Sequence, residues 1–188
     1  MKMRRRERRL QRPNHFVWFY RISSVSLLTL GFVVLLGGAG FRINVTPSEP
    51  LGLWRIVEPD GPILVGDLIF ICPPTTNEMR EARARGYLRS GLCAGHVAPL
   101  IKTVGATAGQ AIDIREEVRI DGRPLPHSRI SRTDGQGREM VPHVGGVVPP
   151  ATVFLHSEFP GSFDSRYFGP LPMEGILGLA LEVWTYAP

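Results

Sequence analysis

The chain contains almost no lysine. Of its 188 residues, 22 are Lys or Arg, and only Lys2 and Lys102 among these are lysines. Residues 1–21 hold eight basic residues against one acidic residue, whereas residues 22–188 hold 14 basic and 16 acidic residues. A nucleic-acid-binding face needs clustered basic side chains that displace counterions. The charge of the body therefore argues against nucleic acid as a partner, and the body holds a single lysine.

Several motifs of hydrolases and nucleotide-binding proteins are absent from the sequence. No two of the five histidines form a His-Glu-x-x-His motif or another close pair, which argues against a zinc hydrolase. There is no Gly-x-Ser-x-Gly elbow and no glycine-rich phosphate loop. The two cysteines lack the Cys-x-x-Cys spacing of a metal site. We therefore expect no metal and no other cofactor, and we interpret each histidine as a surface or core residue.

One long hydrophobic run lies near the N-terminus. Residues 22–41 are uncharged, and a helix of about 20 residues covers about 30 Å, the thickness of the hydrocarbon core of a bilayer. The basic flank favours a cytoplasmic tail at residues 1–21, a transmembrane anchor at 22–41 and an extracytoplasmic domain at 42–188. A cleaved signal peptide, whose apolar core is only about 7–15 residues long, and a buried core helix are the alternatives.

Beyond residue 44, short apolar segments alternate with turn residues. The chain has 21 Gly and 17 Pro, about a fifth of all residues, which suits a β domain with many turns. Residues 77–85 give the one helical signal after the anchor, with Asn77 as the N-cap and Gly86 after the last turn. Residues 128–144 are polar and aperiodic, so we expect a long loop there. The prediction is a mostly β, antiparallel domain with one short helix, whose strands cover residues 52–57, 68–71, 100–104, 111–114, 118–120, 123–125, 147–148, 153–155 and 176–184.

Cys72 and Cys93 are the two cysteines of the chain. An even number of cysteines in a domain that faces an oxidising compartment favours a disulfide. Closing a loop of about 20 residues would stabilise the fold by about 3 kcal/mol. Two buried free thiols are the alternative.

A serine and a lysine are the residues in the body with the best claim to chemistry. Ser48 lies between two prolines, at 47 and 50, that stiffen its loop. Lys102 lies in an apolar stretch, where desolvation would lower its pKa and make a neutral amine available as a base. Arginine keeps its proton in proteins and cannot act in this way. The alternative is a half-buried lysine whose ammonium group reaches solvent.

Three segments resemble, in this order, the conserved boxes of the signal peptidase I family (S26), which are membrane-anchored Ser/Lys proteases. The first is Ser48-Glu-Pro-Leu-Gly-Leu-Trp54, which follows the predicted anchor as in that family. The second runs from Leu100 to Gly109 and is followed by Ile112-Asp-Ile114. The third is Ser162-Phe-Asp-Ser-Arg-Tyr-Phe-Gly-Pro170. The resemblance implies a signal-peptidase-like β fold and a serine peptidase activity.

Within this family the chain resembles in particular the TraF-type conjugative-transfer peptidases, which mature plasmid pilin precursors. General signal peptidases usually carry Met after the serine, where this chain has Glu49. The pattern Ser-x-Pro-x-Gly-Leu-aromatic is similar to the TraF type, and so is the segment from Tyr87 to Cys93. The lysine box commonly ends in Gly-Asp, whereas Gln110 follows the glycine here. That departure concerns local structure and not a catalytic position.

The resemblance implies roles for residues of the first two boxes. Ser48 would attack the scissile carbonyl while Lys102 takes its proton. The backbone N–H of Ser48 and the hydroxyl group of Thr46 would form the oxyanion hole. The family reads small residues before the scissile bond, and we expect Val45, Leu51 and Leu53 to line the pockets that accept them.

The third box implies supporting roles. Ser162 matches the position that orients the lysine through a hydrogen bond. Asp164 and Arg166 match an ion pair near the site, and in the TraF type the aspartate is regarded as functional. A purely structural salt bridge is the alternative for Asp164.

The resemblance also implies partners and a location. The substrate would be a membrane-bound prepilin or preprotein, and the lipid bilayer would be the second partner. We expect a single-pass protein of the bacterial inner membrane, with a cytoplasmic N-terminus and a periplasmic catalytic domain. Hydrolysis and cyclisation of the pilin remain open as outcomes. A general type I signal peptidase and a non-catalytic β domain of pilus assembly are the alternatives.

Overall fold

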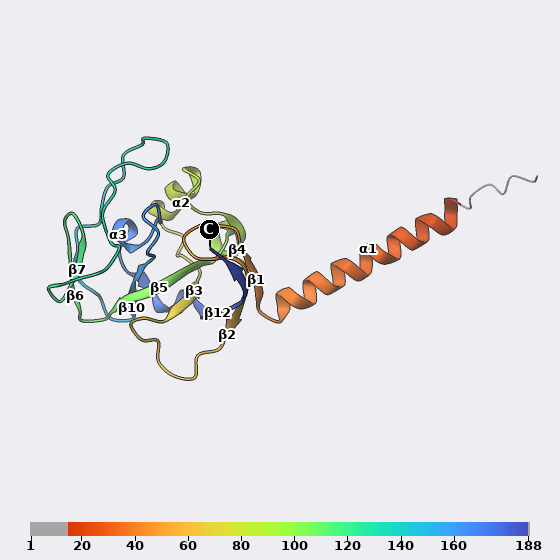
Figure 1. Ribbon diagram of the computed structural model, residues 1–188, viewed down its shortest axis with the longest axis horizontal. Coiled ribbons are helices and arrows are strands. Elements are labelled where there is room, and N and C mark those ends of the chain that lie inside the picture. The colour runs from red at the N-terminus through yellow and green to blue at the C-terminus, as the bar shows by residue number, and fades with distance from the viewer. Residues whose placement is uncertain (1–14, 188) are drawn as a thin grey trace, which may run out of the picture. The chain divides into compact units, whose positions relative to one another are not determined.

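The computed structural model describes residues 15–187 (Figure 1). The chain divides into two compact units, of which the first ends at Ala39 and the second begins at Gly40. Most of the predicted basic tail, residues 1–14, lies outside the described residues.

The described part of the first unit forms one helix, α1, which spans His15–Gly38. Its segment Trp18–Gly38 is long and apolar enough to cross a membrane by length and composition. The helix ends three residues before the predicted end of the membrane segment, and Phe41 begins strand β1 instead. Gly40 explains this early end, because its φ of +87° is favourable only for glycine and its position leaves no room for a Cβ beside the carbonyl of Ile56.

The second unit is built from two antiparallel sheets, which confirms the predicted mostly β fold. The larger sheet has the strand order β1-β2-β12-β3-β5-β10-β11, and the smaller has the order β8-β7-β6-β9. Every strand pair within them is antiparallel. The strands are β1 Phe41–Asn44, β2 Leu51–Val57, β3 Leu68–Ile71, β4 Ser90–Cys93, β5 Leu100–Thr107, β6 Ala111–Ile114, β7 Val118–Ile120, β8 Arg123–Pro124, β9 Gly146–Val147, β10 Thr152–His156, β11 Leu171–Pro172 and β12 Ile176–Tyr186.

Two α-helices accompany the sheets, where the sequence predicted one. Helix α2 spans Asn77–Ala84, and its N-cap is Thr76 and not Asn77, because the Thr76 hydroxyl accepts the N–H of Met79. Helix α3 is a single turn, Ser165–Phe168, capped by Asp164. Such a short helix has no apolar periodicity for a sequence pattern to detect. The two 3₁₀ turns are η1 Ala94–His96 and η2 Met173–Gly175.

The central strands of the larger sheet are buried on both faces. On β3, Ile69 and Ile71 belong to one apolar cluster, while Phe70 faces another with Trp54. This arrangement explains why the strand reads as a continuous apolar run and not as an alternating one. Strand β5 pairs directly with β3, so residues on β5 are held in the middle of the sheet.

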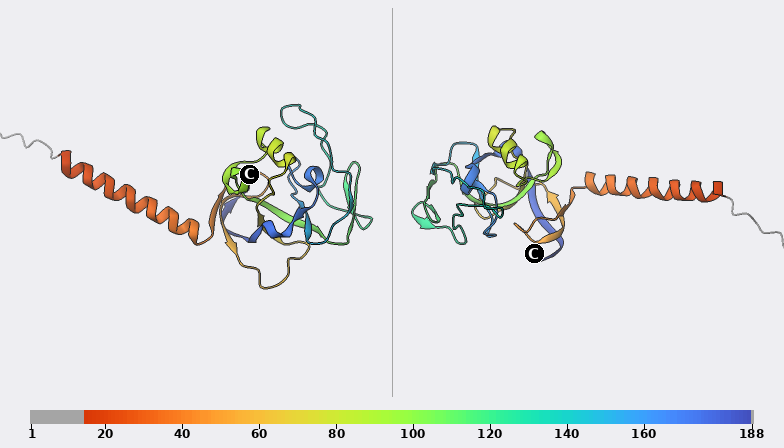
Figure 2. Two further views of the ribbon diagram at one scale, coloured as in Figure 1. Left: turned by 180° about the vertical axis from the view of Figure 1, so that it is seen from behind. Right: turned by 90° about the horizontal axis from the view of Figure 1, so that it is seen from above.

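The predicted loop at residues 128–144 is fixed to the segment that follows α2. The hydroxyl group of Tyr87 donates to Asp134 over 2.7 Å, and Arg138 pairs with the same carboxylate over 2.6 Å. The ring of Tyr87 packs against Phe163, with ring centroids 4.9 Å apart. The loop, which can be followed in both views of Figure 2, therefore supports this segment from outside.

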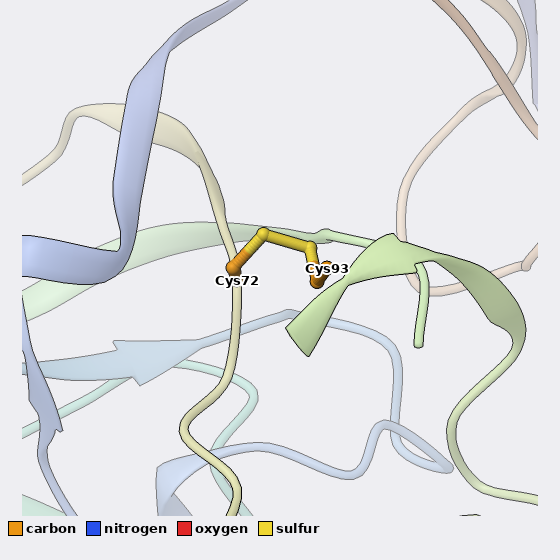
Figure 3. Close-up of a disulfide and its surroundings, with 2 residues drawn as sticks. All are labelled: Cys72 and Cys93. Carbon is orange, nitrogen blue, oxygen red and sulfur yellow. A yellow bond between two sulfur atoms is a disulfide. The ribbon is translucent and has the colours of Figure 1, made fainter. Parts of the chain in front are cut away.

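A disulfide joins Cys72, directly after β3, to Cys93 at the end of β4 (Figure 3). The two Cα atoms lie 5.5 Å apart, a separation within the usual range for a disulfide. The bond ties the segment that carries α2 and β4 to the larger sheet.

We predict that replacing both cysteines, with Cys72→Ser and Cys93→Ser together, lowers the free energy of unfolding by about 3 kcal/mol, because the 21-residue separation is no longer cross-linked in the unfolded chain. Urea denaturation monitored by fluorescence measures this loss. Ser90→Ala, an exposed change in the same strand, is the control and should leave the midpoint nearly unchanged. Alkylation of the unreduced protein should add no mass; two modified thiols would contradict the pairing.

Candidate active site

The turn between β1 and β2 holds Ser48, and a buried asparagine braces that turn. The side-chain amide of Asn44 donates hydrogen bonds of 2.9–3.0 Å to the carbonyls of Thr46, Glu49 and Pro50. Its Oδ1 accepts the backbone N–H of Thr46 over 3.1 Å. One side chain thus satisfies both flanks of the turn, and Ser48 is presented from a fixed loop.

Asn44 also holds the hydroxyl group expected in the oxyanion hole. The Thr46 hydroxyl donates to Asn44 Oδ1 over 2.7 Å, so in this structure its hydrogen points at Asn44. To donate to an oxyanion, the Thr46 hydroxyl group has to rotate away from Asn44 and toward the substrate. Sequence reasoning missed Asn44, and the signal available was only a polar residue at the start of the serine loop.

Lys102 is buried on β5, with 3 % of its surface exposed. Burial lowers the pKa of its amine, while the charges of Asp164 and Glu49 act in the opposite direction. A lysine in such a place is a poor ammonium ion and a good candidate for a neutral base.

A fully buried ion pair lies beside this lysine. Arg166 Nε donates to Asp164 Oδ1 and Arg166 Nη2 to Asp164 Oδ2, each over 2.8 Å. The guanidinium group also donates to the carbonyl of Arg129 over 2.9 Å and to that of Ser162 over 3.3 Å. Such bidentate pairing supplies the partners that a buried carboxylate and a buried guanidinium both need.

The ion pair explains how the lysine can be near a carboxylate and still lose its proton. The negative charge of Asp164 raises the pKa of Lys102, and the positive charge of Arg166 lowers it. The two effects oppose each other, which leaves burial as the largest influence on the amine.

The hydroxyl group of Ser162 is buried in the same cleft, but it has no hydrogen-bond partner in the described part of the chain. The expected hydrogen bond from Ser162 to Lys102 is therefore not made in this structure. The Ser162 carbonyl is instead fixed by Arg166, so the residue is held in position with its hydroxyl group unengaged.

Two buried residues at the end of β10 join the site without having been predicted. The backbone N–H of Ser157 donates to Asp164 over 3.2 Å, and its hydroxyl group donates to the carbonyl of Ser48. His156 places Nδ1 3.8 Å from Asp164, and burial lowers the pKa of its imidazole. His156 and Ser157 are single polar residues at the end of an apolar strand, and such residues form no sequence pattern that would predict a functional role.

A cleft of about 670 Å³ brings the predicted residues together. Ser48, Lys102, Thr46 and Ser162 all line it, whereas Asp164 and Arg166 lie behind its surface. The expectation for the substrate pockets is only partly met, because Val45 lines the cleft and Leu51 and Leu53 do not. Further lining comes from Ile43, Phe70, Tyr87, Arg89, Leu92, Cys93, Ile101, Phe159, Phe163 and Leu177.

Nearly the whole chain is similar to one family of known proteins. The family described as "Signal peptidase, peptidase S26" matches residues 16–185 of this chain. The chain belongs to the signal peptidase S26 family. The resemblance seen in the three sequence boxes is thereby confirmed, and membership makes this S26 protein a serine peptidase.

Three proteins that are similar to this S26 peptidase carry names that refer to conjugal or plasmid transfer. The "Probable conjugal transfer protein TraF" of Sinorhizobium fredii (strain NBRC 101917 / NGR234) is 59 % identical over 167 residues, 89 % of each chain. The "Conjugal transfer protein TraF" of Agrobacterium tumefaciens (strain 15955) is 56 % identical, over 87 % of this chain and 91 % of that protein. The "Plasmid transfer protein TraF" of Escherichia coli is 32 % identical, over 89 % and 98 %.

A solved structure also matches the S26 peptidase at a lower level. The crystal structure of a signal peptidase I from Enterococcus faecalis V583 aligns with a TM-score of 0.40 and 16 % identity, over 63 % of this chain and 97 % of that one. This overlap is too weak to add to the assignment.

We predict that Arg166→Ala destabilises the S26 peptidase by about 3–5 kcal/mol, because it leaves the carboxylate of Asp164 buried and unpaired. Arg119→Ala removes an exposed ion pair with Glu117 and should cost about 1 kcal/mol or less. Chemical denaturation of both variants measures the contrast. Equal, small losses would show that the buried pair does not stabilise the fold in this way.

Proposed function

We propose that this protein is a membrane-anchored serine endopeptidase that cleaves a signal or propeptide from a conjugative pilin precursor, with Ser48 as nucleophile and Lys102 as base. The observation that carries the proposal is the burial of Lys102, the single lysine of the body, in the cleft that also holds Ser48. The names of the conjugal transfer relatives support a role in conjugation.

The chemistry proceeds in two acyl-transfer steps. The neutral amine of Lys102 takes the proton of the Ser48 hydroxyl group as the oxygen attacks the scissile carbonyl. The resulting ammonium group gives this proton to the leaving amine, and an acyl-enzyme ester remains on Ser48. The N–H of Ser48 and the rotated hydroxyl group of Thr46 stabilise the oxyanion, and the loss of one such donor typically costs about 10²–10³ in rate.

The second step decides between two products. Attack by water on the ester releases a linear, shortened precursor. Attack by the amino terminus of the same substrate forms a peptide bond and releases a circular product. Both routes use Lys102 as base and both regenerate the Ser48 hydroxyl group, so the residues of the site are compatible with each.

The arrangement in the membrane follows from the sequence and from α1. The net charge of the first 21 residues favours a cytoplasmic N-terminus. Helix α1 then anchors the protein in the inner membrane, and the domain that follows is periplasmic. This arrangement brings a membrane-bound precursor and the peptidase into the same plane, and it places the cysteines in an oxidising compartment.

The two other functions have less support. A general signal peptidase would not account for the conjugal transfer names of several relatives. A non-catalytic assembly domain would not account for a buried lysine in the cleft that also holds Ser48, since burial of a charged amine is costly.

We expect Ser48→Ala, Lys102→Ala and Lys102→Arg each to abolish processing of a co-expressed candidate pilin precursor. The arginine variant keeps the positive charge but has no accessible neutral form. Lys2→Arg is the matched control for the other lysine and should process normally. Intact-mass spectrometry of the precursor gives the result: a shortened mass indicates hydrolysis, and a further loss of one water indicates cyclisation. Normal processing by Ser48→Ala or Lys102→Arg would refute the dyad.

We also expect kcat/KM to rise with pH along a limb that reports the ionisation of Lys102. Only the neutral amine is a base, and burial lowers the pKa of Lys102 from its usual value of 10.5. Activity should therefore reach its plateau below pH 10.5, as measured with initial rates in buffers of constant ionic strength. A limb centred at or above pH 10.5 would show that the amine is not desolvated in the working enzyme.

A further inference from the structure

Ser157 lies where three parts of the site meet. It is almost completely buried, with 1 % of its surface exposed, at the end of β10. Its backbone N–H donates to Asp164 Oδ2 over 3.2 Å. Its hydroxyl group donates to the backbone carbonyl of Ser48, which is 109 positions away in the sequence, and accepts the N–H of Phe159 over 3.3 Å. One residue thus links the turn of the serine to the carboxylate that faces the lysine.

This link restrains the backbone of the turn that carries the nucleophile. Asn44 holds the N–H and the carbonyl of Thr46, before Ser48, and the carbonyl of Glu49, after it. The bond from Ser157 holds the carbonyl of Ser48 itself. The Ser48 carbonyl thus lies between two held flanks, which limits how far the turn, and the side chain of Ser48 with it, can shift. A misplacement of about 1 Å at a reacting atom can cost about 10²-fold in rate.

On the basis of the function proposed above, we propose that Ser157 is a positioning residue that holds the nucleophilic turn against Asp164. Ser157 touches neither the substrate nor the reacting atoms in this role. It acts through the backbone of Ser48.

The test uses the full-length enzyme and a quenched peptide that spans the cleavage site, which intact-mass spectrometry of the precursor processed by the wild-type enzyme identifies. We expect Ser157→Ala to lower kcat by about 10- to 100-fold with KM unchanged, because the turn loses its fixed direction and not its substrate contacts. Ser157→Thr keeps the hydroxyl group and should restore most of kcat. Ser128→Ala removes an equally buried hydroxyl group that donates to the Leu125 carbonyl, outside the cleft, and should leave kcat unchanged.

The outcomes separate the two proposals. Loss of activity in Ser48→Ala together with wild-type kcat in Ser157→Ala would overturn the role of Ser157 and leave the proposed function intact. Activity in Ser48→Ala would overturn the proposed function itself. Should Ser157→Ala fail to fold, Ser157→Cys still decides, because a thiol is a weaker donor than a hydroxyl group. A lowered kcat with KM unchanged supports the positioning role, and wild-type kcat overturns it.

Discussion

The buried pair of Asp164 and Arg166 is the interaction on which the rest of the site depends. The guanidinium group of Arg166 donates to the carbonyls of Arg129 and Ser162. The backbone carbonyl of Arg166 accepts the N–H of His143. The carboxylate caps α3 and binds Ser157. The pair thus joins the third sequence box, the long loop and the end of β10. Charged groups that are buried away from solvent need hydrogen-bond partners for almost all of their polar atoms. This requirement fixes the geometry around Lys102.

The same pair affects the charge of Lys102. The carboxylate of Asp164 by itself would favour the protonated amine. Arg166 opposes this effect, because its positive charge lowers the pKa of Lys102. The position of the lysine on β5, between β3 and β10, keeps its side chain buried. In a chain with twenty arginines, the single lysine of the body thus occupies a position where burial disfavours a positive charge.

Much of the fold could be predicted from the sequence, because the apolar strands and their turns are local patterns. The buried strand at 68–71 was found from its uninterrupted apolar residues, and the structure places it at Leu68–Ile71. Strand β1, the cap at Thr76 and the one-turn helix α3 were missed, since each depends on contacts made only after folding. The candidate serine and lysine were recognisable by type and by resemblance. Asn44 and Ser157 were not, because a bracing role is visible only when their distant partners are in place.

The disulfide has a consequence for where the enzyme can work. It ties to the sheet a wall of the cleft that carries Tyr87, Arg89 and Leu92. In a reducing compartment the sheet would keep its backbone pairing, but this wall would lose its covalent attachment. A chain that remained in the cytosol would therefore carry the nucleophile and the base without a stable bed for the substrate. The redox state of the surroundings therefore decides whether this wall of the cleft is covalently attached.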